Sequence, residues 1–120
     1  MSEIGYKNLK VLRSLFTVAW HPILIALFLW LTVRYSKGKI VLTSGFREGD
    51  AGVHGTMPLR GLDIRSTVFK NPQQICDDIN KEWIYDDKRP DKKVAIYHNV
   101  GKGLHIHLQI HSNTKWNGGK

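Results

Sequence analysis

The sequence has very little cysteine, and this limits how the fold can be held together. Cys76 is the single cysteine among 120 residues, so no disulfide can form within the chain. One cysteine is typical of a protein in a reducing compartment, and it excludes a zinc site built from several thiolates. A metal ion would therefore need ligands from the six histidines and ten acidic residues.

Negative charge is also scarce. Eighteen lysines and arginines face ten acidic residues, which gives a net charge of +8 at pH 7. A basic surface attracts polyanions such as nucleic acid, anionic lipid or an acidic cell-wall polymer. The basic residues are spread along the chain without an RNA-binding or helix-turn-helix motif, so no specific nucleic-acid partner is predicted. A chain of this length most simply forms one domain with its own core, and we expect a monomer.

Long apolar runs are absent except in residues 15–33, which contain no charged side chain. This run approaches the roughly 20 residues that span a bilayer. Pro22 interrupts it, however, and proline favours the first turn of a helix, so we predict a helix over residues 22–35 that is buried in the core. A membrane anchor is the alternative interpretation. No small-residue cleavage site follows the run, so a secretory signal peptide is not predicted.

Apolar periodicity and turn residues predict an α+β domain. Residues 1–20 form a basic, loosely helical segment, and the glycine-rich residues 44–60 form a loop of the kind that often carries function. Residues from 112 onwards are expected to fray. Helices are predicted over residues 22–35 and 72–83, and strands over residues 39–43, 61–65, 94–98 and 104–111.

The last predicted strand alternates apolar and imidazole side chains. Successive residues of a strand point to opposite faces, so two sets separate: Leu104, Ile106, Leu108 and Ile110 on one face, and His105, His107, Gln109 and His111 on the other. Imidazole is the commonest metal ligand and titrates near neutrality. The polar face is therefore interpreted either as an ordinary solvated face or as part of a metal site.

A carboxylate in an apolar context also indicates a metal site. Asp63 lies between Leu62 and Ile64, where a carboxylate is costly unless it is paired or binds a metal. Together with His54 and one histidine of the last strand, it would supply two nitrogens and one oxygen. Such a set leaves a fourth position for water, as in catalytic zinc sites. Alternatively, His54 is a surface histidine, and Asp63 caps a turn or pairs with a neighbouring arginine.

These residues, in this order, resemble the LAS metallopeptidases. That group contains D-alanyl-D-alanine carboxypeptidases and dipeptidases, murein endopeptidases and phage endolysins, and the hedgehog signal domain shares its fold. The resemblance covers roughly residues 20–111 and is carried by four motifs: Ser44-Gly45-Phe46-Arg47, His54, Arg60-Gly61-Leu62-Asp63 and His105-Ile106-His107. It implies a zinc domain over residues 21–114, with a small antiparallel sheet flanked by helices, between the basic segment 1–20 and a tail at 115–120.

The resemblance also implies a ligand set. His54, Asp63 and His107 would hold Zn²⁺, with His105 the main rival for the third position. Otherwise His105 would lie beside the metal as a proton carrier or oxyanion partner. Arg47 would bind the substrate and stabilise the transition state, unless it only forms a salt bridge with an adjacent carboxylate.

Two further residues are candidates for the same site. His98 lies across the predicted hairpin from His105 and is either a catalytic group at the edge of the site or a surface residue. Trp83 either lines the substrate site or packs in the core. Both assignments depend on how the hairpin and the second helix meet the metal ligands.

The chain departs from the family pattern in two ways. His54 and Asp63 are nine positions apart, whereas the family has seven. The family also places an acidic general base three residues before the last zinc histidine, where this chain has Leu104, which leaves His105, His98 or Glu82 as candidates.

Two functions follow from the resemblance and its departures. The first is a zinc-dependent peptidase that hydrolyses a peptidoglycan stem peptide and is phage-encoded or bacterial. It would be made in the cytoplasm and act at the cell wall. The second is a catalytically inactive metal-binding recognition module on the same fold, which the missing acidic base favours.

Overall fold

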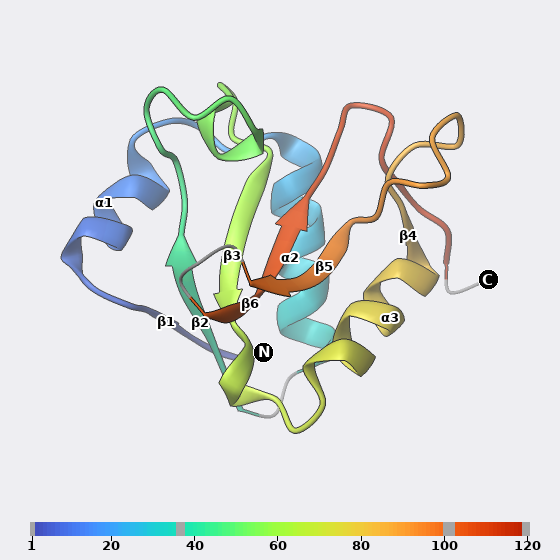
Figure 1. Cartoon of the computed structure of the whole chain (residues 1–120), viewed down its shortest axis with the longest axis horizontal. Helices are drawn as coiled ribbons and strands as arrows, with labels where there is room; N and C mark the ends of the chain where they lie inside the picture. Colours follow the sequence, from blue (N-terminus) through green and yellow to red (C-terminus); the bar gives the residue numbers. More distant parts are fainter. Residues whose placement is uncertain (1, 36–37, 100–102, 119–120) are drawn as a thin grey trace.

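A mixed five-stranded sheet and three α-helices make up the computed structural model, which describes residues 2–35, 38–99 and 103–118 (Figure 1). The helices are α1 (Leu9–Phe16), α2 (Pro22–Arg34) and α3 (Pro72–Glu82). The sheet has the order β1 (Glu3–Tyr6), β2 (Lys39–Ser44), β3 (Gly61–Arg65), β6 (Leu104–Gln109) and β5 (Ala95–Asn99). A separate pair joins β4 (Trp83–Ile84) to β7 (Lys115–Trp116). The predicted α+β class is confirmed.

The sheet is antiparallel except at one edge, where β1 pairs with β2 in parallel from Glu3 opposite Lys39 to Tyr6 opposite Leu42. A parallel pair needs a long crossover, which α1 and α2 provide here. The sheet predicted as antiparallel is therefore mixed, with one parallel pair at its edge. Residues 3–6 are mostly exposed, so backbone pairing with β2 rather than apolar burial makes them a strand. Pairing with a strand that is distant in sequence leaves no mark in the local pattern of apolar residues.

Helix α2 forms where the sequence predicts. Pro22 occupies its first turn, and His21 Nδ1 accepts a hydrogen bond from the backbone N–H of Ile23 at 3.1 Å. Its inner face is completely buried. This apolar segment is thus a core helix, and no helix in the described ranges has the length and apolar character needed to cross a bilayer.

Alternation along β3 and β6 gives the sheet one apolar face and one polar face. Leu62 and Ile64 on β3, and Ile106 and Leu108 on β6, are completely buried. They belong to one hydrophobic cluster with residues of α2 and α3, and α2 crosses behind the sheet in Figure 1. The intervening residues of β3 and β6 therefore face the other side, where the candidate ligands lie.

The hairpin predicted for the histidine strand is confirmed in its two arms. β5 and β6 pair antiparallel, with His98 opposite His105. Residues 100–102 of the connecting loop lie outside the described residues. The pairing brings three histidines onto adjoining strands.

The segment after residue 112 was predicted to fray, and this is wrong for the residues up to Trp116. Trp83 pairs with Trp116 in the two-stranded β4–β7 unit. The Thr114 hydroxyl is buried and donates a hydrogen bond to the backbone oxygen of Tyr85 at 2.7 Å. These contacts join residues about thirty positions apart, which a local pattern does not reveal.

Candidate metal centre

The pairing of β3 with β6 brings Asp63 and His107 side by side. The two residues are directly opposite each other in the antiparallel register, and the flanking pair Leu62–Leu108 faces the core. The same alternation that buries the core therefore turns the carboxylate and the imidazole to the other face. His107 Nδ1 lies 2.9 Å from Asp63 Oδ1.

His54 reaches the same carboxylate from the glycine-rich loop. It lies in a short 3₁₀ turn, Val53–Gly55, that packs against β3. Gly61 makes this packing possible, because a Cβ there would lie 2.3 Å from Val53 Cγ2. His54 Nε2 consequently lies 3.2 Å from Asp63 Oδ1.

The nine-residue spacing between His54 and Asp63 is accommodated by a closed loop. The Thr56 hydroxyl donates to the backbone oxygen of Val53 and accepts from the backbone N–H of Arg60, both at 2.8 Å. The two residues beyond the family spacing therefore do not keep His54 away from Asp63.

The three side chains form a group whose ligand atoms all lie within 4.8 Å of one another. The His54, Asp63 and His107 side chains expose 4%, 9% and 12% of their surface. Two imidazole nitrogens and one carboxylate oxygen are the donor set of many catalytic zinc sites. These residues could therefore hold a metal ion.

The outward nitrogens of both imidazoles meet oxygens that must accept. His54 Nδ1 lies 2.8 Å from the backbone oxygen of Gly45, so Nδ1 carries a hydrogen. His107 Nε2 lies 3.2 Å from Gln109 Oε1. The Gln109 amide is oriented by a 2.8 Å hydrogen bond from its Nε2 to the backbone oxygen of Lys93. His107 Nε2 therefore also carries a hydrogen.

These hydrogen bonds to outer oxygens determine which ring atoms the two histidines present to Asp63. A neutral His54 then presents the lone pair of Nε2, and a neutral His107 presents that of Nδ1. Both lone pairs point at Asp63 Oδ1, at 3.2 and 2.9 Å, so three acceptors converge. Either extra protons or a cation must separate them. A single divalent cation would satisfy all three atoms at once, as in zinc sites whose histidines donate to an outer oxygen.

The two histidines favour the ionised form of Asp63. Burial by itself raises the pKa of this carboxyl group, but when His107 and His54 are protonated their hydrogen bonds and charges outweigh burial. The pKa of Asp63 is therefore held well below its usual range. The oxygen ligand is in its metal-binding form before any ion arrives.

Acid is expected to destabilise the metal-free protein through Asp63. Because the folded-state pKa is lower than the ordinary value of 3.8, the stabilisation is complete above that value and is lost as pH falls below it. Urea unfolding in chelator at about pH 5, 4 and 3 should show a steeper loss for wild type than for Asp63→Asn. Parallel losses in the two proteins would contradict this prediction.

Gln109 is expected to control metal affinity without touching the metal. Gln109→Leu removes the acceptor for His107 Nε2 and frees the ring to turn, so Zn²⁺ affinity should fall by about 10- to 100-fold. Competition with a chromophoric chelator measures this. Gln109→Glu keeps an acceptor and serves as the matched control, with a smaller loss. Unchanged affinity in Gln109→Leu would count against the assigned tautomer.

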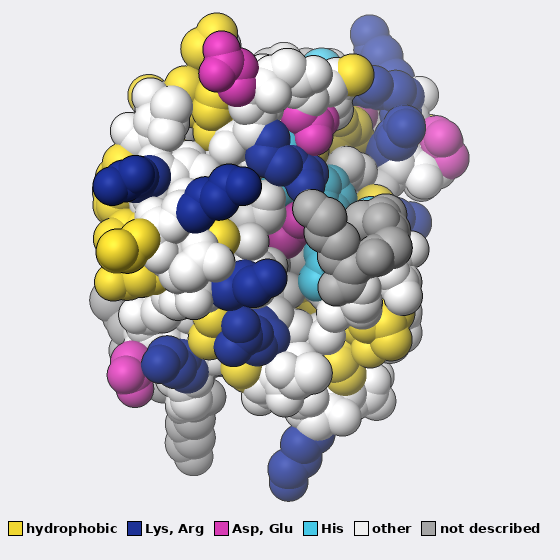
Figure 2. Space-filling view, turned by 60° about the vertical axis from the view of Figure 1, so that its left-hand side comes forward, with side chains coloured by type: hydrophobic (Ala, Val, Ile, Leu, Met, Phe, Trp, Pro, Cys, Tyr) yellow, Lys and Arg dark blue, Asp and Glu magenta, His cyan; other side chains and the backbone are white. Residues whose placement is uncertain are grey.

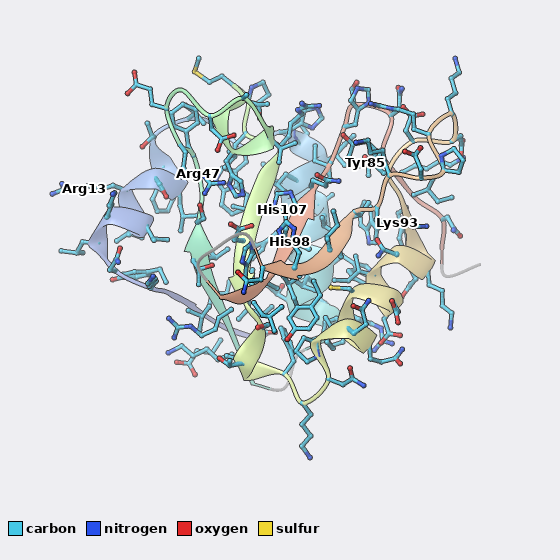
Figure 3. The ribbon with its side chains drawn as sticks, viewed as in Figure 1. Arg13, Arg47, Tyr85, Lys93, His98 and His107 are labelled. Carbon is cyan, nitrogen blue, oxygen red and sulfur yellow. The ribbon has the colours of Figure 1, made fainter. Side chains whose placement is uncertain are left out.

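Two more histidines lie beside the group. His105 Nε2 is 3.6 Å from Asp63 Oδ1. The His98 ring is centred 4.8 Å from that of His105 and 5.4 Å from that of His107, and Figure 3 shows His98 and His107 on neighbouring strands. Burial lowers the pKa of His98, and the nearby charges of His105 and His107 lower it further, against the opposing effect of Asp63. His98 is thus part of this imidazole cluster.

A pocket of about 520 Å³ opens beside Asp63 and His105, and Arg47 lies on its wall. Arg47 Nε also lies 3.2 Å from Asp50 Oδ2, and its backbone N–H donates to the backbone oxygen of His54 at 2.7 Å. Figure 3 shows Arg47 on the loop beside the strands that carry the histidines. Arg47 therefore both lines the pocket and forms an ion pair.

Two residues considered for the site lie elsewhere. Trp83 is 6% exposed and packs edge-on against Trp30, with ring centroids 6.1 Å apart. Glu82 pairs with Arg34 at 3.8 Å. Neither lines the pocket in the described part of the chain. Trp83 is thus a core residue instead of the predicted substrate-binding residue, and Glu82 is not within reach as a base.

The sequence did not predict the groups that hydrogen-bond to the outer nitrogens of the two histidines or orient those partners. Gln109 was visible on the polar face two residues after His107, and that spacing was its only signal. The oxygens of Gly45 and Lys93 belong to the backbone, so no residue type marks them.

Comparisons with models of known protein families, with curated proteins and with solved structures found no match for this chain. The resemblance to the LAS metallopeptidases therefore rests on the quoted motif residues alone. The chemistry of the centre is argued from its own side chains.

Proposed function

We propose that the protein is a zinc-dependent hydrolase that cleaves an amide bond in a peptidoglycan stem peptide. The observation that carries this proposal is the convergence of His54 Nε2 and His107 Nδ1 on Asp63 Oδ1, with both outer nitrogens already donating to oxygens. The resemblance of the motifs to LAS metallopeptidases supports the substrate class. The net charge of +8 suits an anionic wall polymer.

The residues around the pocket suit amide hydrolysis. A zinc ion bound to the three ligands would lower the pKa of its water towards neutrality and polarise the scissile carbonyl. Arg47 would exchange Asp50 for a substrate carboxylate or a developing oxyanion, which a guanidinium binds through charge-assisted hydrogen bonds. His105 lines the pocket and would carry a proton to or from the reacting bond. His98 packs edge to face against the His105 ring and would orient it.

The lack of a second carboxylate favours an alternative. In the described residues, Asp63 is the one acidic side chain that lines the pocket. Leu104, at the position of the family's base, is 55% exposed. Proton transfer would thus fall to an imidazole. A metal-binding module that recognises a peptide or wall fragment without cleaving it is the second candidate.

Metal analysis combined with a cleavage assay separates these candidates. We expect about one zinc per purified chain and release of fragments from muropeptides, followed by mass spectrometry. His105→Ala should keep zinc and lose cleavage, whereas the control His111→Ala should keep both. Zinc without cleavage in the wild type would favour the recognition module. No metal after reconstitution, or iron in place of zinc, would contradict the proposal.

A further inference from the structure

One part of the pocket wall is basic and comes largely from the N-terminal segment. Lys7 and Lys10, around the start of α1, and Arg65, on β3, line the pocket together with Asp63. None of these three cations has a carboxylate partner in the described part of the chain. They are therefore free to meet a ligand.

The charges in the pocket do not balance. Four basic side chains line it, the fourth being Arg47, against the single carboxylate of Asp63. Asp63 is already engaged by His54 and His107, and Arg47 is paired with Asp50. Figure 2 shows lysine and arginine side chains in a band beside histidine and acidic side chains of this face. Uncompensated cations around a concave site raise the local concentration of anions.

The amino end of α1 adds to the positive potential. Asn8 caps the helix by accepting from the backbone N–H of Val11 at 2.9 Å, and the first intrahelical bond runs from Leu12 N–H to Asn8 O. The N–H groups of Leu9 and Lys10 precede that bond. The positive end of the helix dipole and these N–H groups favour an anion at this place. Asn8 lines the pocket as well.

We propose that Lys7, Lys10 and Arg65 form an anion subsite that holds a negatively charged group of the substrate, a carboxylate or a phosphate, next to the metal centre. This inference rests on the proposed function and specifies its substrate as a peptide that is acidic on the α1 side of the scissile bond. Arg47 is not part of the subsite, because the proposed function assigns it to the reacting end of the substrate and Asp50 partners it until then.

Binding of matched peptides tests the subsite. Three capped peptides that differ at one position, carrying Glu, Gln or phosphoserine, are titrated by calorimetry into zinc-loaded and zinc-free protein. The Glu peptide should bind about tenfold tighter than the Gln peptide, the usual effect of one charge-assisted hydrogen bond. Tighter binding of the phosphoserine peptide, with competition by inorganic phosphate, would identify phosphate as the source of the anion.

Variants assign the preference to these residues. Lys10→Gln and Arg65→Gln should each remove most of the Glu-over-Gln preference and leave binding of the Gln peptide unchanged. Lys10→Arg should retain the preference. Lys81→Gln, an equal charge change at an exposed position of α3, is the matched control and should also retain it. Equal binding of the Glu and Gln peptides, or an equal loss in Lys81→Gln, would overturn the proposal.

The result separates the subsite from the proposed function. A Glu preference that persists in zinc-free protein, in a chain that neither retains zinc nor cleaves muropeptides, would support the subsite and reject the hydrolase. Normal zinc content and cleavage with no Glu preference would support the hydrolase and reject the subsite.

Discussion

Replacing Asp63 with alanine is expected to remove zinc from the protein and to abolish cleavage, while the domain still folds. Asp63 Oδ1 is the atom on which both His54 Nε2 and His107 Nδ1 converge. Without it two ligands remain, one fewer than catalytic zinc sites use. The loss of affinity should exceed the roughly 10- to 100-fold that loss of an outer partner causes.

Elemental analysis and thermal unfolding measure this loss. Zinc should raise the unfolding temperature of wild type, because an ion that binds only the folded state stabilises it, and should not raise that of Asp63→Ala. Asp86→Ala is the matched control. It removes another buried carboxylate, one that accepts from Arg89 and Asn113, so it should destabilise the fold and keep zinc. Retention of zinc by Asp63→Ala would refute the assigned centre.

Ile106→Ala is expected to lower the free energy of unfolding by about 2–5 kcal/mol, the usual cost of emptying a buried aliphatic site. Ile106 is completely buried on the core face of β6, between His105 and His107, and is paired in register with the equally buried Ile64. The cavity would therefore lie directly behind the candidate ligands.

Urea unfolding of the metal-free protein measures the effect of Ile106→Ala. Leu104→Ala is the matched control, because Leu104 occupies the same strand and the same alternation but is 55% exposed. Its change should be within about 0.5 kcal/mol. Similar losses in the two variants would mean that burial of Ile106 in the core is not the cause of its larger expected cost.

The meeting of Asp63 with His107 was largely predictable from the sequence. A charged residue between Leu62 and Ile64, and imidazoles alternating with apolar residues in the last strand, each predict one polar face. Pairing β3 with β6 in register then joins the two faces. The pattern did not say which histidine would contact the carboxylate most closely, because that depends on the register.

Features held by distant backbone pairing could not be predicted. β1 and β7 are short, and most of their side chains are exposed, so no apolar period marks them. Their partners lie more than thirty residues away along the chain. The position of Lys10 on the pocket wall follows from β1, since pairing of that strand with β2 brings α1 against the sheet.

The fold holds the three candidate ligands in different ways, and this bears on how fast a bound metal ion would exchange. Asp63 and His107 lie on strands that pair through backbone hydrogen bonds. They can separate only if the pairing of β3 with β6 is broken. His54 sits on the three-residue 3₁₀ turn Val53–Gly55, which belongs to no strand of the sheet. Asp63 and His107 are thus expected to stay together while the turn that carries His54 opens and closes. The dissociation rate of zinc should therefore follow the opening of residues 53–55 and be nearly independent of the global unfolding rate.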